Sequence, residues 1–237
     1  MKYLLDNQYA PTTFSWGFID APFDRTIDTF VSWSVSIFKH YRIEYEVVRY
    51  QGSLTNLLAQ LFPVTAPCRR EMLTSTASGW TAYFDNFRNG GDPISRVGQM
   101  CDMLKCRGVA VTCAPDRHPE WGRGTFGGVQ FQLFAPHETD FINHLRHVGV
   151  TCDDDGWAFD TNGPVQPFEE TLEYSAHRVR DRFTAEMLER YCAALGIDLF
   201  NPEFYGPNAV MVVDRSPLSP TSPCLSREEA RHALGLD

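Results

Sequence analysis

A strand, helix, strand order occurs twice in this sequence and limits the folds that the chain can adopt. Each block begins with a short apolar strand that opens on a tryptophan and closes near an aspartate, followed by a helix with one apolar face. The two blocks are residues 16–50, which begin WGFID, and residues 80–113, which begin WTAYFD. They could be duplicated β-α-β units, whose strands would run in parallel. Because the two helices share little sequence, a chance resemblance explains the common order equally well.

The other elements call for antiparallel neighbours. Two pairs of strand-like segments flank tight turns, as in β-hairpins; they are residues 150–152 with 157–159, and residues 68–74 with 80–86. Further helices are predicted over 54–62, 92–107, 136–148 and 184–195, and further extended segments over 109–113, 129–134 and 172–182. The sequence therefore predicts an α+β fold, with a mixed, largely antiparallel sheet and helices packed on it.

The composition changes near the C-terminus. Residues 215–223 (RSPLSPTSP) cannot pack as a core element, and Ser226 with Glu229 forms a capping box for a short helix. That helix is expected to dock on the body of the protein or on a neighbour. We expect a single α+β domain over 1–214, with a subdivision near 65–78 left open, a Pro/Ser linker over 215–225 and a C-terminal helix over 226–237.

The charge of the chain favours some partners over others. A net charge of −9 argues against nucleic acid and against an anionic membrane surface, and it suits a basic protein partner. The sequence has no apolar run long enough to span a membrane, and its seven cysteines form no CxxC pair, as expected of buried thiols in a reducing compartment. We therefore expect a cytoplasmic protein with a basic protein partner, no nucleic-acid or membrane partner and no cofactor.

Residues 79–93 (GWTAYFDNFRNGGDP) combine aromatic and polar side chains on a loop between a strand and a helix. Large side chains held by a rigid scaffold are typical of a recognition surface, although a structural turn would use the same residue types. Asp92 precedes Pro93 and is expected to cap the helix, not to bind. The contact residues predicted from this segment are Tyr83, Asp85, Asn86 and Arg88.

The turn of the other hairpin predicts a second contact surface. Three consecutive carboxylates suggest calcium by composition, but the segment lacks the twelve-residue EF-hand layout and its closing glutamate. An exposed acidic turn beside a tryptophan suits a basic partner better. The residues are Asp153, Asp154, Asp155 and Trp157.

Four polar residues share one face of the helix predicted over 136–148. Imidazoles at this spacing, with a carboxylate from the same face, could hold a metal ion. The solvated face of an amphipathic helix is the competing interpretation, and no HExxH motif is present. The four residues are His137, Asp140, His144 and His147.

Three arginines alternate in HRVRDR and would project from one face of an extended segment. They could hold a phosphate or a carboxylate, or they could be neutralised by glutamates of the same stretch. The arginines are Arg178, Arg180 and Arg182, and the glutamates are Glu169, Glu170 and Glu173.

The blocks WTAYFDN…GGDP and DRFTAEMLERYCAALGI together resemble the cytosolic immunity proteins of bacterial toxin–immunity systems, over residues 79–200 at most. The resemblance implies a protein that binds a cognate toxin domain and blocks its active site with acidic and aromatic side chains, and it carries no residue over by motif. The alternative function is a hydrolase or transferase. Its site would be lined by histidine and aspartate, either His118 or the histidines of 136–148 with Asp140, with or without a metal ion. It would act on an anionic substrate held by the arginines.

Overall fold

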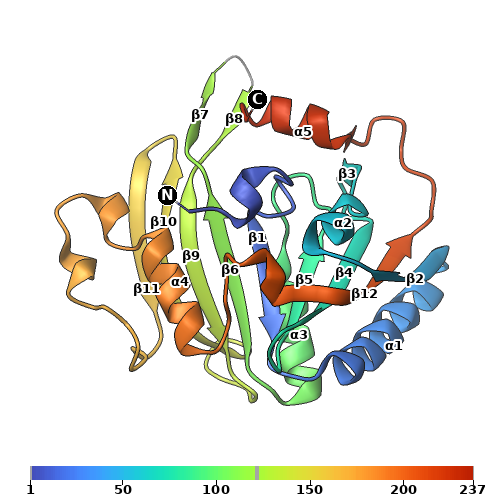
Figure 1. Ribbon diagram of the computed structural model, residues 1–237, viewed down its shortest axis with the longest axis horizontal. Coiled ribbons are helices and arrows are strands. Elements are labelled where there is room, and N and C mark those ends of the chain that lie inside the picture. The colour runs from blue at the N-terminus through green and yellow to red at the C-terminus, as the bar shows by residue number, and fades with distance from the viewer. Residues whose placement is uncertain (1, 121–122, 237) are drawn as a thin grey trace.

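The computed structural model describes residues 2–120 and 123–236, and its centre is a nine-stranded sheet (Figure 1). The strand order is β11-β10-β9-β6-β1-β5-β4-β12-β2, and all neighbouring strands in it are antiparallel. The strands are β1 (Ser15–Ile19), β2 (Tyr45–Gln51), β4 (Arg70–Thr76), β5 (Thr81–Asp85), β6 (Gly108–Ala114), β9 (Gly128–Phe134), β10 (His144–Asp153), β11 (Gly156–Asn162) and β12 (Tyr205–Asp214). The predicted α+β fold is confirmed, and the large sheet is wholly antiparallel.

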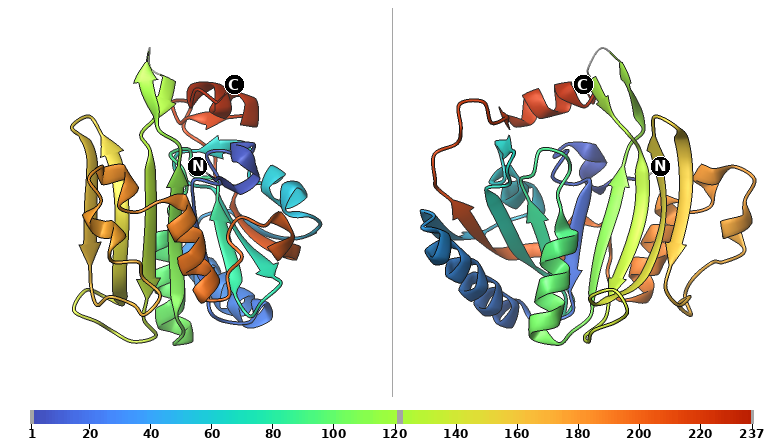
Figure 2. Two further views of the ribbon diagram at one scale, coloured as in Figure 1. Left: turned by 60° about the vertical axis from the view of Figure 1, so that its left-hand side comes forward. Right: turned by 180° about the vertical axis from the view of Figure 1, so that it is seen from behind.

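Helices cover both faces of the sheet, so the protein has three layers (Figures 1 and 2). Helices α1 (Phe23–Tyr41) and α3 (Pro93–Leu104) pack on one face, whereas α2 (Leu54–Ala59) and α4 (Ala185–Ala194) pack on the other. Each layer contact is made by the apolar stripe that the sequence spacing predicts, and each fully buried large side chain contributes about 1.5–3 kcal/mol. Thr184 caps α4, because its side chain accepts a hydrogen bond from the backbone N–H of Met187.

Both strand, helix, strand blocks form β-α-β units in which the two strands point the same way. Because neighbouring strands are antiparallel, β1 and β2 run in the same direction with β5, β4 and β12 between them. In the second unit, β5 and β6 run in the same direction with β1 between them. Each unit is therefore a split β-α-β unit, and the expected parallel strands are present but are not neighbours.

The tail helix and several smaller elements complete the fold. The tail helix α5 (Arg227–Ala233) begins with the predicted capping box and docks on the body of its own chain, where Ala230 and Leu236 are buried and Arg231 Nη1 donates to the carbonyl of Asn7 at 2.6 Å. The other small elements are β3 (Val64–Thr65), which pairs with β13 (Cys224–Leu225), the hairpin β7 (Arg117–Glu120) and β8 (Arg123–Thr125), and the 3-10 turns η1 (Leu4–Asn7), η2 (Glu173–Ser175), η3 (Val179–Asp181) and η4 (Pro202–Phe204).

The prediction of a helix over 136–148 is wrong. Ile142 has a left-handed φ of +58°, and from His144 the chain enters β10, which hydrogen-bonds to β9 on one side and to β11 on the other. Backbone pairing on both sides satisfies the same groups that a helix would satisfy, and it buries Val148 and Val150 in the core as well. The helical spacing of the four polar residues in this segment is coincidental.

The prediction of an extended segment over 172–182 is also wrong. This stretch forms the turns η2 and η3, so the three arginines do not project as a row. Arg182 Nε donates to the carbonyl of Ala176 at 3.0 Å. Among the described residues none of the three glutamates pairs with these arginines: Glu169 pairs with Arg146 and Glu170 with Arg190. Arg180 instead lies 4.0 Å from Asp181 of the same stretch.

Candidate functional site

Within the residues that the structure describes, part of the sheet has no helix over it on the side of α3. Helix α3 lies over β1, β5, β6 and the near part of β9, whereas α4 packs behind β9 on the opposite face (Figure 2, right). On the open side, β9, β10 and β11 present polar side chains, because the alternating residues on their other side fill the core under α4. These polar residues are Gln130, Gln132, His147, Thr151, Asp160 and Asn162.

A groove lies along this open face, in two adjoining hollows that share Gln132, Phe141 and His144. The larger hollow, of about 860 Å³, lies between α3 and residues 135–144, and the smaller one, of about 430 Å³, lies over β10 and β11. A groove of this size that combines apolar walls with a few polar groups is the usual form of a binding site. We take it as the candidate functional site.

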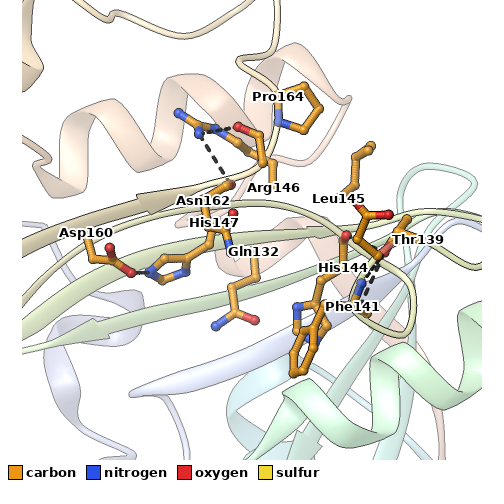
Figure 3. A pocket seen from close by; sticks show the side chains of 12 residues that line it. Gln132, Thr139, Phe141, His144, Leu145, Arg146, His147, Asp160, Asn162 and Pro164 are labelled. Carbon is orange, nitrogen blue, oxygen red and sulfur yellow. Dashed lines mark hydrogen bonds and ion pairs between the residues drawn. The ribbon is translucent and has the colours of Figure 1, made fainter.

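Two histidines reach this groove from one strand because β10 is irregular. The register with β9 shifts between His144 and Arg146, so His144 and His147 lie on the same side of the strand while Arg146 lies on the other (Figure 3). His147 Nε2 lies 3.8 Å from Asp160 Oδ2. Burial lowers the pKa of His144 and of His147, which favours the neutral form of both imidazoles.

Three buried polar atoms of the groove have no hydrogen-bond partner in the described part of the chain. They are Asn143 Oδ1, Gln132 Oε1 and His147 Nδ1. Asn143 is 2% exposed, and its amide Nδ2 donates to the carbonyl of Gly98 at 2.9 Å. Leaving a buried polar atom unpaired is costly, so each of these atoms needs an explanation, and a ligand or solvent in the groove supplies one.

The rim of the groove is acidic. Glu138 and Asp140 are exposed carboxylates with no ion-pair partner among the described residues, and Asp160 faces only His147. Asp102 also lines the groove but pairs with Lys105 at 2.7 Å. Two large apolar side chains stand beside these charges, since Phe141 is 64% exposed and Ile142 is 66% exposed.

The structure places three of the four contact residues predicted from 79–93 inside the protein. Tyr83, Asp85 and Asn86 are at most 2% exposed. The hydroxyl of Tyr83 donates to Glu71 Oε1 at 2.9 Å, and burial raises the pKa of Tyr83 well above its usual value. Their polar groups are thus bonded within the chain, and the exposed part of this predicted surface is reduced to Arg88.

Asp92 does not cap α3 through its side chain. The backbone N–H of Asp92 instead donates to Asp85 Oδ2, and the N–H of Phe87 donates to Asp85 Oδ1, both at 2.9 Å. Asp85 therefore holds the loop between β5 and α3 in place through backbone N–H groups of that loop. This is what the structural-turn interpretation of residues 79–93 predicts for Asp85.

The remaining predicted contact residues lie near the end of the sheet that α5 covers. Asp153, Asp154 and Asp155 form an exposed turn between β10 and β11, as predicted, whereas Trp157 is partly buried against the core. Arg88 lines a hollow with α5 and β8, and its neighbour Asn89 lines a further hollow with Cys152. Arg88 and the acidic turn therefore lie at the same end of the sheet.

Asp85→Asn is expected to change how stability depends on pH. Burial raises the pKa of Asp85 from 3.8 to about 6, although hydrogen bonds from the Asp92 and Phe87 backbone oppose this effect. Because the folded pKa is the higher one, ionisation costs the folded state about 2–3 kcal/mol once the pH rises from below 4 to above 6. Urea denaturation at a series of pH values measures the free energy of unfolding of both proteins. The value for wild type minus that for Asp85→Asn should fall by about 2–3 kcal/mol as the pH rises from below 4 to above 6. Asp92→Asn, at an exposed carboxylate close by, is the control. If the free energy of unfolding of wild type and of Asp85→Asn differed by the same amount at every pH, the prediction would be contradicted.

Comparison with known proteins finds no matching family model, no matching curated protein and no matching solved structure. Within the described residues, no helix is both long and apolar enough to cross a membrane, and no group of three or more His, Cys, Asp and Glu side chains is placed to hold a metal ion. The side chain of His118, a residue of the alternative enzyme site, lies outside the described part of the structure.

Sequence reasoning singled out Asp140, His144 and His147 from the groove, on the basis of a helix that does not form, and it missed Gln132 and Asn143. One signal was available in the sequence. Apolar Val148 and Val150 alternate with polar or small residues from 146 to 151, which is typical of a half-buried strand, and Gly149 is a poor helix former.

Proposed function

We propose that the protein is a non-enzymatic binding protein that docks a basic protein partner against the open face of the sheet. The observation that carries this proposal is a set of exposed carboxylates that border one uncovered face without cationic partners in the described chain. They are Glu138, Asp140 and Asp160 at the groove and Asp153, Asp154 and Asp155 at the β10–β11 turn.

The arrangement suits protein recognition for two reasons. Exposed carboxylates of one sign attract a basic partner over a distance and raise the association rate. Phe141 and Ile142 add apolar surface at the centre of the same face, where contact excludes water and contributes most of the affinity. In its specific form, the proposal is a cytoplasmic immunity protein that blocks a basic toxin domain, which is the function that the sequence resemblance implies.

Replacing the three carboxylates of the turn (Asp153→Asn, Asp154→Asn and Asp155→Asn together) is expected to slow association with the partner about 3–10-fold at low salt, because rim charges act mainly on the association rate. The partner is first captured from the source cells with the wild-type protein, and its association rate is then measured over a range of ionic strengths. The wild-type rate should fall as salt is added.

The matched control removes three exposed carboxylates far from this surface: Asp24→Asn, Asp28→Asn and Glu44→Gln. This control has the same net charge as the turn variant, and its association rate should remain closer to that of wild type. Equal effects of the two triple variants, or a wild-type rate that ignores ionic strength, would overturn the proposal. The immunity form also requires that the captured partner stops cell growth when expressed alone and that co-expression of this protein restores growth.

The second candidate function is a hydrolase or transferase. The observation that favours it is the neutral His147 imidazole beside Asp160 in the groove, which could act as a general base. The acidic rim disfavours the anionic substrate expected for it, and Arg178, Arg180 and Arg182 do not line the groove. Turnover that is lost in His147→Gln without loss of folding would establish an enzyme in place of a binding protein.

A further inference from the structure

We propose that the hollow between α3 and residues 135–144 receives the cationic end of an arginine or lysine side chain. This inference rests on the proposed function, because it specifies which group of the basic partner enters the groove. It depends on three independent features of the hollow: the kind of atoms left unpaired, the charge of its rim and its apolar walls.

The unpaired polar atoms of the groove are hydrogen-bond acceptors. The orientation of the Asn143 amide is set by its Nδ2, which donates to the carbonyl of Gly98, so the buried atom without a partner is the acceptor Oδ1. The carboxylate of Asp160 lies 3.8 Å from His147 Nε2 and favours the tautomer with the proton on that nitrogen, in which the buried Nδ1 is an acceptor. Gln132 Oε1 is a third buried acceptor without a partner. Asn143 lines the larger hollow, His147 the smaller one and Gln132 both, so a ligand that reaches these atoms has to present hydrogen-bond donors, as guanidinium and ammonium groups do.

The charges around the hollow select a cation. Glu138 lines the larger hollow and Asp140 lines the adjoining one, and neither has an ion-pair partner among the described residues. Arg146 also lines the smaller hollow, but its guanidinium points to the other side of β10 and is paired there with Glu169. An anionic ligand would be repelled by this rim, and a neutral apolar ligand would leave Asn143 Oδ1 unpaired.

The walls of the hollow suit the aliphatic part of such a side chain. Ile94, Phe134, Phe141 and Ile142 line it together with the polar groups. The stems of arginine and lysine pack along apolar surface while the charged end reaches polar partners. A cation can also lie against the exposed ring of Phe141, with favourable cation–π attraction. The hollow thus has a place for both parts of a long basic side chain.

The test is an NMR titration of the isotope-labelled protein with Nα-acetyl-arginine N-methylamide, the corresponding lysine compound and the citrulline compound. Citrulline has nearly the shape of arginine but carries no charge. We expect the arginine or the lysine compound to shift the amide signals of Gly98 and Asn143 and the ring signals of His144, with an affinity at least about tenfold above that of citrulline. Equal binding of citrulline, or no binding of either cation, would overturn the inference.

Variants on the rim distinguish a specific site from a general attraction. Glu138→Gln with Asp140→Asn should weaken binding of the cationic compound about 5–10-fold, while Asp24→Asn with Asp28→Asn, on the far helix α1, should leave it unchanged. Thermal unfolding of both variants checks that they remain folded, as expected for exposed residues. Equal weakening in both variants would contradict a site in the hollow.

The two proposals can fail separately. If the basic partner binds but neither cationic compound binds in the hollow, this inference alone is overturned. If a cationic compound binds in the hollow but no basic partner binds the protein, the proposed function alone is overturned.

Discussion

Arg146→Met is expected to lower the free energy of unfolding by about 3–5 kcal/mol, because it leaves a buried carboxylate without its cation. The Arg146 side chain is 4% exposed and that of Glu169 is fully buried. Arg146 donates from Nε and Nη2 to the two oxygens of Glu169, at 2.8 and 2.7 Å, and from Nη1 to the carbonyl of Gly163 at 2.8 Å. Tyr174 and the Gln166 backbone also donate to Glu169, so the pair anchors residues 163–175 to β10.

The chain contains a matched control for this experiment. Arg190 makes the same two-bond contact with Glu170, at 2.6 and 2.7 Å, but its side chain is 55% exposed. Arg190→Met should therefore cost less than about 1 kcal/mol. The double variant Arg146→Met with Glu169→Leu should recover much of the stability that Arg146→Met loses, because it removes both charges together. Chemical denaturation measures all these variants; an Arg146→Met loss no larger than that of Arg190→Met would contradict the expectation.

The pH dependence of stability is a second test of the pair formed by Arg146 and Glu169. Burial acts to raise the pKa of Glu169, but hydrogen bonds from Arg146, Gln166 and Tyr174 outweigh it and hold the pKa below its usual value. This pair therefore stabilises the wild-type protein above the unfolded pKa of glutamate and loses that contribution as the pH falls through the folded pKa. Without Arg146, burial makes protonation of Glu169 favourable in the folded state. The difference in stability between wild type and Arg146→Met should consequently shrink at acidic pH.

Asn86→Ala is expected to lower the free energy of unfolding by about 3–5 kcal/mol, because the fully buried Asn86 side chain makes hydrogen bonds to three backbone groups. Asn86 Oδ1 accepts from the backbone N–H groups of Arg69 and Arg70, both at 2.8 Å. Its Nδ2 donates to the carbonyl of Pro63 at 2.9 Å and to the hydroxyl of Thr65 at 3.3 Å. Alanine would leave the backbone N–H groups of Arg69 and Arg70 and the carbonyl of Pro63 without this partner at the point where β3, β4 and β5 meet.

Asn89→Ala is the control for this prediction, since Asn89 is exposed three residues further along the same loop. Its replacement should change stability by no more than about 0.5 kcal/mol. Urea denaturation followed by tryptophan fluorescence and by circular dichroism measures both variants. If Asn86→Ala were as mild as Asn89→Ala, Asn86 would be free for the contact role that the sequence suggested.

The local sequence was sufficient for most elements of the fold. Helices α1, α3 and α4 follow apolar residues at helical spacing, and the hairpin of β10 and β11 follows alternating residues around the turn DDDG. The capping box before α5 and the strand, helix, strand order of both β-α-β units are also found as expected. These features depend on residues that are close together in the chain, so their spacing carries the information.

Residues 136–148 show where such reasoning fails. Their spacing is compatible with a helix, but β9 and β11 offer backbone partners on both sides of β10, and those contacts outweigh a weak local preference. The error had consequences for the site, because a helix would place His137, Asp140, His144 and His147 on one face. In the folded chain, β10 carries two of these residues, His144 and His147, to the groove. They share one side of the strand because the register with β9 shifts between them, and the sequence pattern does not reveal this shift.

Residue type and spacing therefore established the α+β class, the order of the main elements and an exposed acidic turn. They could not show that Tyr83, Asp85 and Asn86 of the aromatic loop are buried, because burial depends on segments that are distant in the sequence. Tyr83 bonds to Glu71 and Asn86 bonds to Pro63 and Arg70, although Asp85 bonds within its own loop. The groove also depends on segments that are far apart in the sequence. Its walls come from α3, β9, β10 and residues 135–144, and it stays open because α4 packs on the opposite face of the sheet. Burial and concavity arise when distant segments meet, and for that reason they appear only in the folded chain.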